Sequence, residues 1–314
     1  MNTINDKSAA SGGNATNNAA PPSCDRQRVL LPVRKRVDWP LEYDSNQALR
    51  KIAVIDTETT GLDWAKHRVI EICAASVLVN AEGRIIAIER VGTGLEYPGH
   101  PLSREISELT GLTDAMLENK VIDRDKLTPF LSECEAVLAF NSGFDRSFAE
   151  ALLPDLPAMS WGCVMADVPW RKLGFENGPQ NYLLMQAGRF AAEAHRAKQD
   201  VLSLIELLDH VCTDGTSIMA KVLSAIDAPA WRFEATWASY HQRDLLRDRR
   251  YRWRPDGRSG VWHKHIRGDE YQAEWDWHLS VIGHEPAVIP LPATERYRHD
   301  RSWKPVERKA KITA

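Results

Sequence analysis

Two carboxylates one residue apart end an apolar segment of this chain. The segment reads KIAVIDTETTGL, residues 51–62, and contains Asp56 and Glu58. Side chains along a strand alternate between its two faces, so these carboxylates point the same way. They repel each other unless a cation lies between them, and hard divalent ions such as Mg²⁺ take such oxygen ligands. By itself the pattern fits a metal site and an exposed acidic strand end about equally well.

Two later segments carry further acidic residues. In EAVLAFNSGFDRSF, residues 135–148, an apolar strand over 136–140 leads into a helix with Asp145 in its first turn. In HRAKQDVLSLIELL, residues 195–208, apolar residues recur at helical spacing, and Asp200 lies in the first turn. His195 precedes Asp200 by five residues. Together the segments favour a shared site over an isolated acidic strand end.

The three segments resemble the motifs of the DEDDh exonucleases, the DnaQ-like 3′–5′ exonucleases that include the epsilon subunit of bacterial DNA polymerase III. The first motif is D-x-E, at Asp56 and Glu58, and the second corresponds to FNSGFD, which ends at Asp145. The third is H-x4-D, from His195 to Asp200. The stretch ISELTGLTDAML, residues 106–117, is also similar to a family segment. The resemblance covers about residues 50–212, and it departs at Phe140, where the family commonly has His.

The resemblance implies a two-metal mechanism with Mg²⁺ or Mn²⁺. Asp56, Glu58 and Asp200 would bind one ion, and Asp56 would bridge to a second ion held by Asp145 directly or through water. His195 would accept the proton of the attacking water, for which an imidazole is suited at neutral pH. Without the other motifs, His195 would be interpreted as a surface histidine.

The resemblance also implies a substrate-binding segment after D-x-E, at Thr59, Thr60, Gly61 and Leu62. Gly61 would allow close approach of the backbone, and Leu62 would wedge against the last base or else lie in the core. Asn141 would contact the sugar or phosphate, or would only cap the following helix.

Composition agrees with a globular α/β protein. Strands expected near 51–56, 68–79, 82–92, 136–140 and 160–165 alternate later with helices near 144–152, 180–187 and 198–212, after earlier helices near 103–109 and 125–134. This order predicts a mixed sheet covered by helices, and the resemblance implies the ribonuclease H-like fold.

The sequence also predicts a cytoplasmic protein without membrane association. Its five cysteines are scattered and form no C-x-x-C pair, and it has neither an apolar run of bilayer length nor a signal-peptide pattern.

The chain is expected to divide into several parts. Residues 1–27 are rich in Asn, Ala, Ser and Gly, which predicts disorder. Residues 28–48 form a lead-in segment with a basic cluster at 34–36. Residues 49–213 form the exonuclease domain, residues 214–290 a small α+β module, and residues 291–314 a tail.

The predicted module is rich in tryptophan and arginine. Seven of the eleven tryptophans lie after residue 213, and residues 231–267 contain ten basic against four acidic side chains. The stretch YRWRPDGRSGVWHKH predicts a hairpin that turns at 255–257, and a helix with Tyr271 and Trp275 on one face follows. Arginines neutralise phosphates and aromatic rings stack on bases. The tryptophans fit a small core equally well.

These observations predict a metal-dependent 3′–5′ exonuclease acting on single-stranded or frayed DNA ends. An exoribonuclease of the same fold is the nearest alternative, because the motifs do not distinguish the sugars. A non-catalytic module that binds DNA ends or a polymerase is the alternative from another class. The absence of a convincing clamp-binding motif leaves association with a DNA polymerase open.

Overall fold

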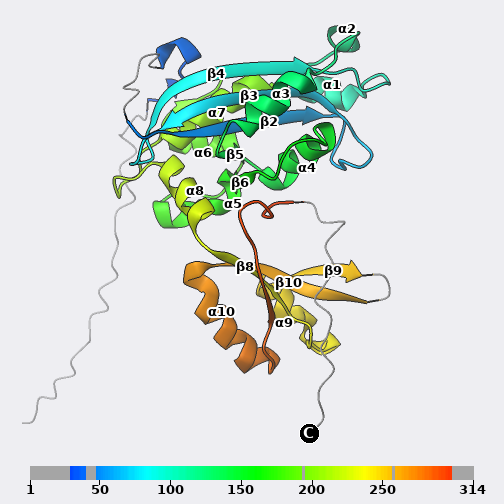
Figure 1. Ribbon diagram of the computed structural model, residues 1–314, viewed down its shortest axis with the longest axis vertical. Helices are drawn as coiled ribbons and strands as arrows, with labels where there is room; N and C mark the ends of the chain where they lie inside the picture. The colour runs from blue at the N-terminus through cyan, green and yellow to red at the C-terminus, as the bar shows by residue number, and fades with distance from the viewer. Residues whose placement is uncertain (1–28, 40–46, 193–194, 257–258, 299–314) are drawn as a thin grey trace, which may run out of the picture.

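A computed structural model describes residues 29–39, 47–192, 195–256 and 259–298 (Figure 1). The expected disorder of residues 1–27 therefore lies outside the described residues. Helices cover both faces of a five-stranded sheet, and a smaller four-stranded sheet with its own helices lies to one side. Among the residues described, no helix combines the length and the apolar character needed to cross a membrane.

The large sheet has the strand order β4-β3-β2-β5-β6. Its members are β2 (Arg50–Thr59), β3 (Val69–Val79), β4 (Ile85–Leu95), β5 (Ala136–Ala139) and β6 (Ser160–Cys163). β3 is antiparallel to both of its neighbours, whereas β5 runs parallel to β2 and β6 parallel to β5. This confirms the predicted mixed sheet and the ribonuclease H-like α/β class. Every residue of β3 is buried, as its apolar sequence requires for a central strand.

In the described residues, eight α-helices accompany this sheet. They are α1 (Arg104–Thr110), α2 (Asp114–Leu117), α3 (Arg124–Ser132), α4 (Ser142–Leu152), α5 (Val164–Asp167), α6 (Gln180–Gln186), α7 (Ala197–Asp209) and α8 (Ile218–Asp227). Apolar residues of α6, α7 and α8 form one core with one face of the sheet, and those of α3 and α4 form a second core on the other face. The sheet therefore separates α7 from α4, and both helices begin near the end of β2 that carries the paired carboxylates.

The lead-in segment is held against the sheet domain. Strand β1 (Leu31–Pro32) pairs in parallel with β7 (Arg189–Phe190). The guanidinium of Arg34 forms ion pairs with Glu206 at 2.9 Å and with Asp209 at 2.8 Å, both on α7. Arg36 donates to the Glu89 carbonyl. Two of the three basic side chains at 34–36 are therefore engaged within the protein, which disfavours a nucleic-acid contact by this cluster.

The C-terminal module is an antiparallel sheet of order β11-β8-β10-β9. Its elements are β8 (Ala230–Glu234), α9 (Arg243–Asp248), β9 (Arg252–Asp256), β10 (Ser259–Arg267), α10 (Tyr271–Trp277) and β11 (Ala287–Pro290). The predicted hairpin is present, with Trp253 directly opposite Trp262, although Gly257 and Arg258 in its turn lie outside the described residues. Four tryptophans pack around the core of this module: Trp231, Trp262, Trp275 and Trp277. Most of the described tryptophans of this module thus serve its packing, while Trp253 is 50% exposed.

The chain returns from the module to the large sheet. The Arg146 side chain on α4 is fully buried and donates to the carbonyls of Thr294, at 2.7 Å, and of Arg296. The backbone N–H of Trp161 on β6 donates to the Ala293 carbonyl, and Arg267 pairs with Asp167 at the end of α5. Residues 291–298 of the expected tail therefore pack on the sheet domain, and residues 299–314 lie outside the described part.

Helix α8 bears on where the first domain ends. Its apolar residues, among them Ile218, Val222 and Ile226, are buried in the core shared with α7. Strand β8, which begins at Ala230, belongs to the separate core of the module. We therefore propose that the boundary falls between α8 and β8, later than residue 213.

Candidate active site

The paired carboxylates lie at the end of β2, in the middle of the large sheet. Asp56 is opposite Cys73 of β3, and Glu58 is opposite Glu71. Because positions 56 and 58 are two apart, both side chains point to the face that α7 covers. The pairing with β3 is irregular between Glu58 and Thr59, so the strand leaves the sheet just after the acidic pair.

Helix α7 brings a third carboxylate to this pair. The amide of Asp200 donates to the Arg196 carbonyl at 3.0 Å, which places the residue in the first turn of the helix. Asp56, Glu58 and Asp200 each offer an oxygen atom, and these atoms lie within 4.8 Å of one another. In the part of the chain that the structure describes, this is the one grouping of three acidic or metal-binding side chains of this kind. Three hard oxygen ligands suit Mg²⁺ or Mn²⁺.

Asp145 approaches from the other side of β2 and stands apart from these three. It lies in the first turn of α4, and its carboxylate accepts hydrogen bonds from the Thr57 amide, at 3.1 Å, and the Thr57 hydroxyl, at 2.8 Å. Thr57 lies between Asp56 and Glu58 on the strand, so these bonds fix Asp145 to the strand that carries the acidic pair. No pattern in the sequence indicates this anchor, because it joins residues 88 positions apart.

Burial and mutual repulsion disfavour the charged forms of these carboxylates. Burial, and then the charge of Asp145, hold the pKa of Asp56 well above its usual range. Burial and the charge of Asp200 raise the pKa of Glu58 to about 7. The pKa of Asp145 also rises to about 7 because of burial, against the effect of the Thr57 hydrogen bonds. A bound cation would reverse this balance, since positive charge favours carboxylate ions.

The raised pKa values predict how stability changes with pH in EDTA. Between about pH 4.5, where free carboxyls titrate, and about pH 7, the folded protein holds more protons than the unfolded chain. The free energy of unfolding should therefore fall as pH rises through this window. Added Mg²⁺ should raise the melting temperature more at pH 8 than at pH 5. Thermal unfolding at both pH values, with EDTA and with Mg²⁺, measures this, and equal shifts would contradict it.

His195 lies at the edge of the site on the approach to α7. Its side chain is exposed, and its backbone φ of 63° lies in the left-handed region that residues other than glycine rarely adopt. Burial raises the pKa of Asp200, and the nearby charge of His195 opposes that rise. The structure therefore places an exposed imidazole close to the third carboxylate.

The residues after the acidic pair form a turn. The Thr59 hydroxyl donates to the Gly61 carbonyl at 2.8 Å, and the Thr60 hydroxyl accepts from the Arg68 amide. A Cβ atom at Gly61 would lie 2.6 Å from the His67 ring, so only glycine fits there without displacing that ring. Leu62 is 86% exposed, which contradicts the alternative that it lies in the core.

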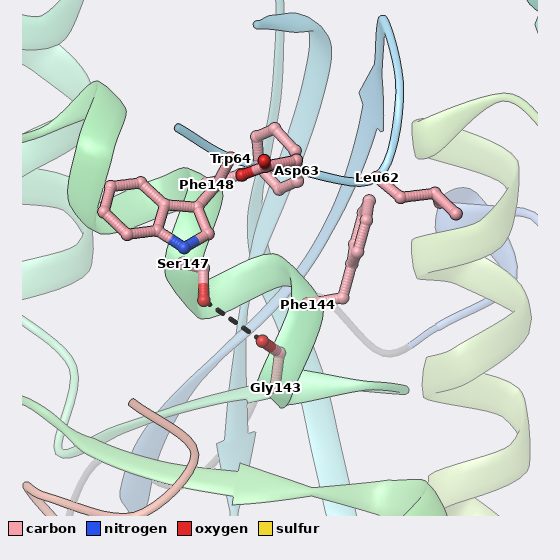
Figure 2. A pocket seen from close by; sticks show the side chains of 7 residues that line it. All are labelled: Leu62, Asp63, Trp64, Gly143, Phe144, Ser147 and Phe148. Atoms are coloured by element: carbon pink, nitrogen blue, oxygen red, sulfur yellow. Dashed lines mark hydrogen bonds between the residues drawn. The ribbon is translucent and has the colours of Figure 1, made fainter. Parts of the chain in front are cut away.

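Leu62 lines a pocket of about 300 Å³ beside the turn. Figure 2 shows Leu62, Trp64 and Phe144 gathered around it, with the Ser147 hydroxyl donating to the Gly143 carbonyl. The complete lining is Leu62, Asp63, Trp64, Gly143, Phe144, Ser147 and Phe148. Sequence reasoning did not single out Trp64 and Phe144, although Phe144 lies inside the second motif. Their aromatic faces are suited to stacking on a base.

Two other motif residues flank the site. Asn141 is the N-cap residue of α4, yet its side chain forms no capping hydrogen bond, which disfavours the alternative that it serves only as a cap. Phe140, the departure from the motif, is partly buried and packs against the core beneath α7.

The fold and the site define an α/β nuclease-like domain, and comparison with known proteins agrees. A family model described as "Exonuclease" matches residues 53–172. DNA polymerase III PolC-type of Thermotoga maritima is 33% identical over 202 residues, and that of Thermotoga petrophila is 35% identical over 123 residues. These matches cover 60% and 38% of this chain, but only 14% and 9% of the relatives. The chain thus spans a small part of the length of the curated relatives it matches.

Solved structures show weaker likeness. Exonuclease X in complex with 5′ overhanging duplex DNA has 23% sequence identity and a TM-score of 0.37, over 54% of this chain and 99% of that one. Exonuclease I has 14% identity and a TM-score of 0.46, over 76% and 64%. The sequence matches and the site support a DnaQ-like exonuclease domain in this chain.

Proposed function

We propose that the protein is a metal-dependent 3′–5′ exonuclease that hydrolyses phosphodiester bonds at DNA 3′ ends. The observation that carries the proposal is the cluster of Asp56, Glu58 and Asp200, whose oxygens lie within 4.8 Å of one another. Such a cluster disfavours its own ionisation unless a cation is bound. The match to the exonuclease family model supports the nuclease class, and the names of the PolC-type relatives favour DNA.

Each side chain has a role in this proposal. Asp56, Glu58 and Asp200 would hold one divalent ion, and Asp56 and Asp145 would hold a second, Asp145 directly or through water. When bound, the ions supply positive charge that stabilises the attacking and leaving oxygens of the displacement. An imidazole nitrogen of His195 accepts the proton of the attacking water. The exposure of His195 leaves that nitrogen accessible to solvent.

The pocket next to the cluster would receive the end of the strand. Leu62 and the ring of Phe144, which line the pocket, would pack against the terminal base. Thr59, Thr60 and the Gly61 backbone, in the turn that precedes Leu62, would border the sugar and phosphate. Asn141 would contact the backbone of the substrate. Contacts of this kind are independent of sequence, so single-stranded or frayed ends of any sequence should serve.

Matched DNA and RNA oligonucleotides test the proposal. With a label on the 5′ end, 3′–5′ digestion gives a ladder of shortening labelled products, whereas digestion from the 5′ end releases the label as mononucleotide at once. We expect the ladder on DNA with Mg²⁺ or Mn²⁺ and none with EDTA. A ladder on RNA alone would favour the exoribonuclease alternative, and binding without cleavage would favour the non-catalytic one.

The structure limits which basic residues of the C-terminal module can contact a bound nucleic acid. Several of its charges are paired internally, as in Arg249 and Lys264 with Glu274. Arg250 and Arg252 are exposed and form no ion pair among the described residues, and they precede the exposed Trp253 in the sequence. We propose that these two arginines contact the phosphates of a bound strand.

Salt dependence of binding measures that contact. Each single-strand phosphate neutralised adds about 0.7 to the slope of log affinity against log salt. Replacing both Arg250 and Arg252 by alanine should lower the slope by about 1.4, to a similar extent for different sequences. Arg247→Ala is the matched control, because Arg247 already pairs with Asp244. An unchanged slope in the double variant would assign the charge of this region to solvent or to a protein partner.

A further inference from the structure

A fifth carboxylate lies beside the proposed metal ligands. Glu71 of β3 is directly opposite Glu58, so the two side chains share one face of the sheet, and Glu71 is only 3% exposed. Like charges at directly opposed positions destabilise a sheet. Its charge also raises the pKa of Asp56, Glu58 and Asp200. A buried glutamate at this place therefore needs a compensating partner.

That partner is Arg196. Its Nε atom lies 3.1 Å from one Glu71 oxygen and its terminal nitrogen 3.0 Å from the other, which is the two-pronged geometry of strong arginine–carboxylate pairs. The backbone N–H of Ala197 donates to Glu71 as well, at 3.1 Å. Both Glu71 oxygens are thus engaged, and Glu71 stands outside the group of three proposed metal ligands.

These bonds fix the start of helix α7. Arg196 is the N-cap residue, and its side chain forms no capping bond within the helix. Glu71 instead reaches from β3 and accepts from the first helical N–H, where a negative charge stabilises a helix. The same turn carries Asp200, and the preceding residue is His195 in its left-handed conformation. One ion pair therefore sets where both side chains lie relative to β2.

We propose that Glu71 and Arg196 are positioning residues that hold Asp200 and His195 in register with Asp56 and Glu58. The pair acts through helix α7 and contacts neither substrate nor reacting atoms. Glu71 lies on β3, the strand next to the one that carries Asp56 and Glu58. The ion pair between Glu71 and Arg196 therefore ties the start of helix α7 to the sheet beside these two carboxylates. The proposal rests on the proposed nuclease function, but its effect on metal binding is separate from any effect on turnover.

Arg196→Ala and a matched control test this role. Arg34 also pairs with a buried glutamate of α7, Glu206, but near the other end of the helix. The two pairs have similar side-chain exposure. The exposed fractions are 37% for Arg196 and 29% for Arg34, and 4% and 3% for their partners Glu71 and Glu206. We expect both alanine variants to lower the melting temperature, and Arg196→Ala alone to lower kcat and Mn²⁺ affinity, each by about 10–100-fold, as for residues that orient metal ligands.

Two further variants keep the test decisive if Arg196→Ala does not fold. Arg196→Lys retains the charge without the two-pronged contact, and Glu71→Gln retains the shape without the charge. Both should fall between wild type and Arg196→Ala in kcat and Mn²⁺ affinity, with KM changed less than kcat. Added guanidinium should restore part of the kcat of Arg196→Ala and none of the kcat of Asp56→Asn.

Mn²⁺ affinity separates this proposal from the proposed function. If wild-type protein cleaves no oligonucleotide, the nuclease proposal fails, and the Mn²⁺ titrations alone decide the role of the Glu71–Arg196 ion pair. If kcat and Mn²⁺ affinity of folded Arg196→Ala, Arg196→Lys and Glu71→Gln all match those of Arg34→Ala, the pair only stabilises the fold and the inference is overturned.

Discussion

Replacing Asp56 by asparagine should abolish nuclease activity while making the metal-free protein more stable. Asp56 belongs to the cluster of three oxygen ligands and would bridge both ions. An amide removes one negative charge from that cluster, so turnover should fall by about four orders of magnitude or more, within the large contributions attributed to metal-stabilised charge. Burial and neighbouring carboxylates disfavour the Asp56 charge, so its removal should raise the melting temperature in EDTA at pH 8.

The opposite signs of these two effects make the test sharp. A variant that had merely damaged the fold would lose activity and stability together. Asp155→Asn is a suitable control, because this exposed carboxylate lies outside the cluster and its replacement changes the net charge equally. Near-normal turnover in folded Asp56→Asn would rule out the proposed site.

Replacing His195 should lower turnover without removing the metal. General-base catalysis contributes about 100–10,000-fold, so kcat should fall within that range. Asparagine is the substitution of choice, because His195 has a φ of 63° and asparagine tolerates the left-handed region better than alanine does. Mn²⁺ affinity and DNA binding should stay near those of wild type.

The pH profile identifies the base. Protonation of an imidazole base should lower the wild-type rate as pH falls, but protonation of Glu58, with its pKa raised to about 7, would weaken metal binding on the same side of the profile. Saturating Mn²⁺ should suppress the second effect and leave the first. His100→Asn, at an exposed histidine elsewhere on the sheet domain, is the control. If His195→Asn retains the wild-type rate and profile, another group accepts the proton.

The elements that carry the site were predictable because local sequence encodes them. The expected strand at 51–56 and helix at 198–212 are observed as β2 and α7, at 50–59 and 197–209. Both have a strong apolar pattern bordered by an acidic residue, Asp56 at the end of β2 and Asp200 in the first turn of α7, so the position of each carboxylate follows from its element. The hairpin of the C-terminal module was equally predictable from its turn residues and its flanking tryptophans.

The contacts that fix the site could not be predicted, because they join residues distant in sequence. Glu71 and Arg196 are 125 positions apart, and Glu71 lies in the interior of an apolar strand without a motif around it. Strand β11 is only four residues long, and it forms by pairing with β8, which is distant in sequence. The return of residues 291–298 to Arg146 likewise depends on carbonyl groups, which every residue has and no pattern marks.

Anomalous diffraction from crystals of the protein soaked in Mn²⁺ locates the bound ion directly. We expect a peak coordinated by oxygens of Asp56, Glu58 and Asp200, and no such peak in crystals of Asp56→Asn. An absent peak at these three residues in wild-type protein that cleaves DNA under the same Mn²⁺ concentration would contradict the proposed site.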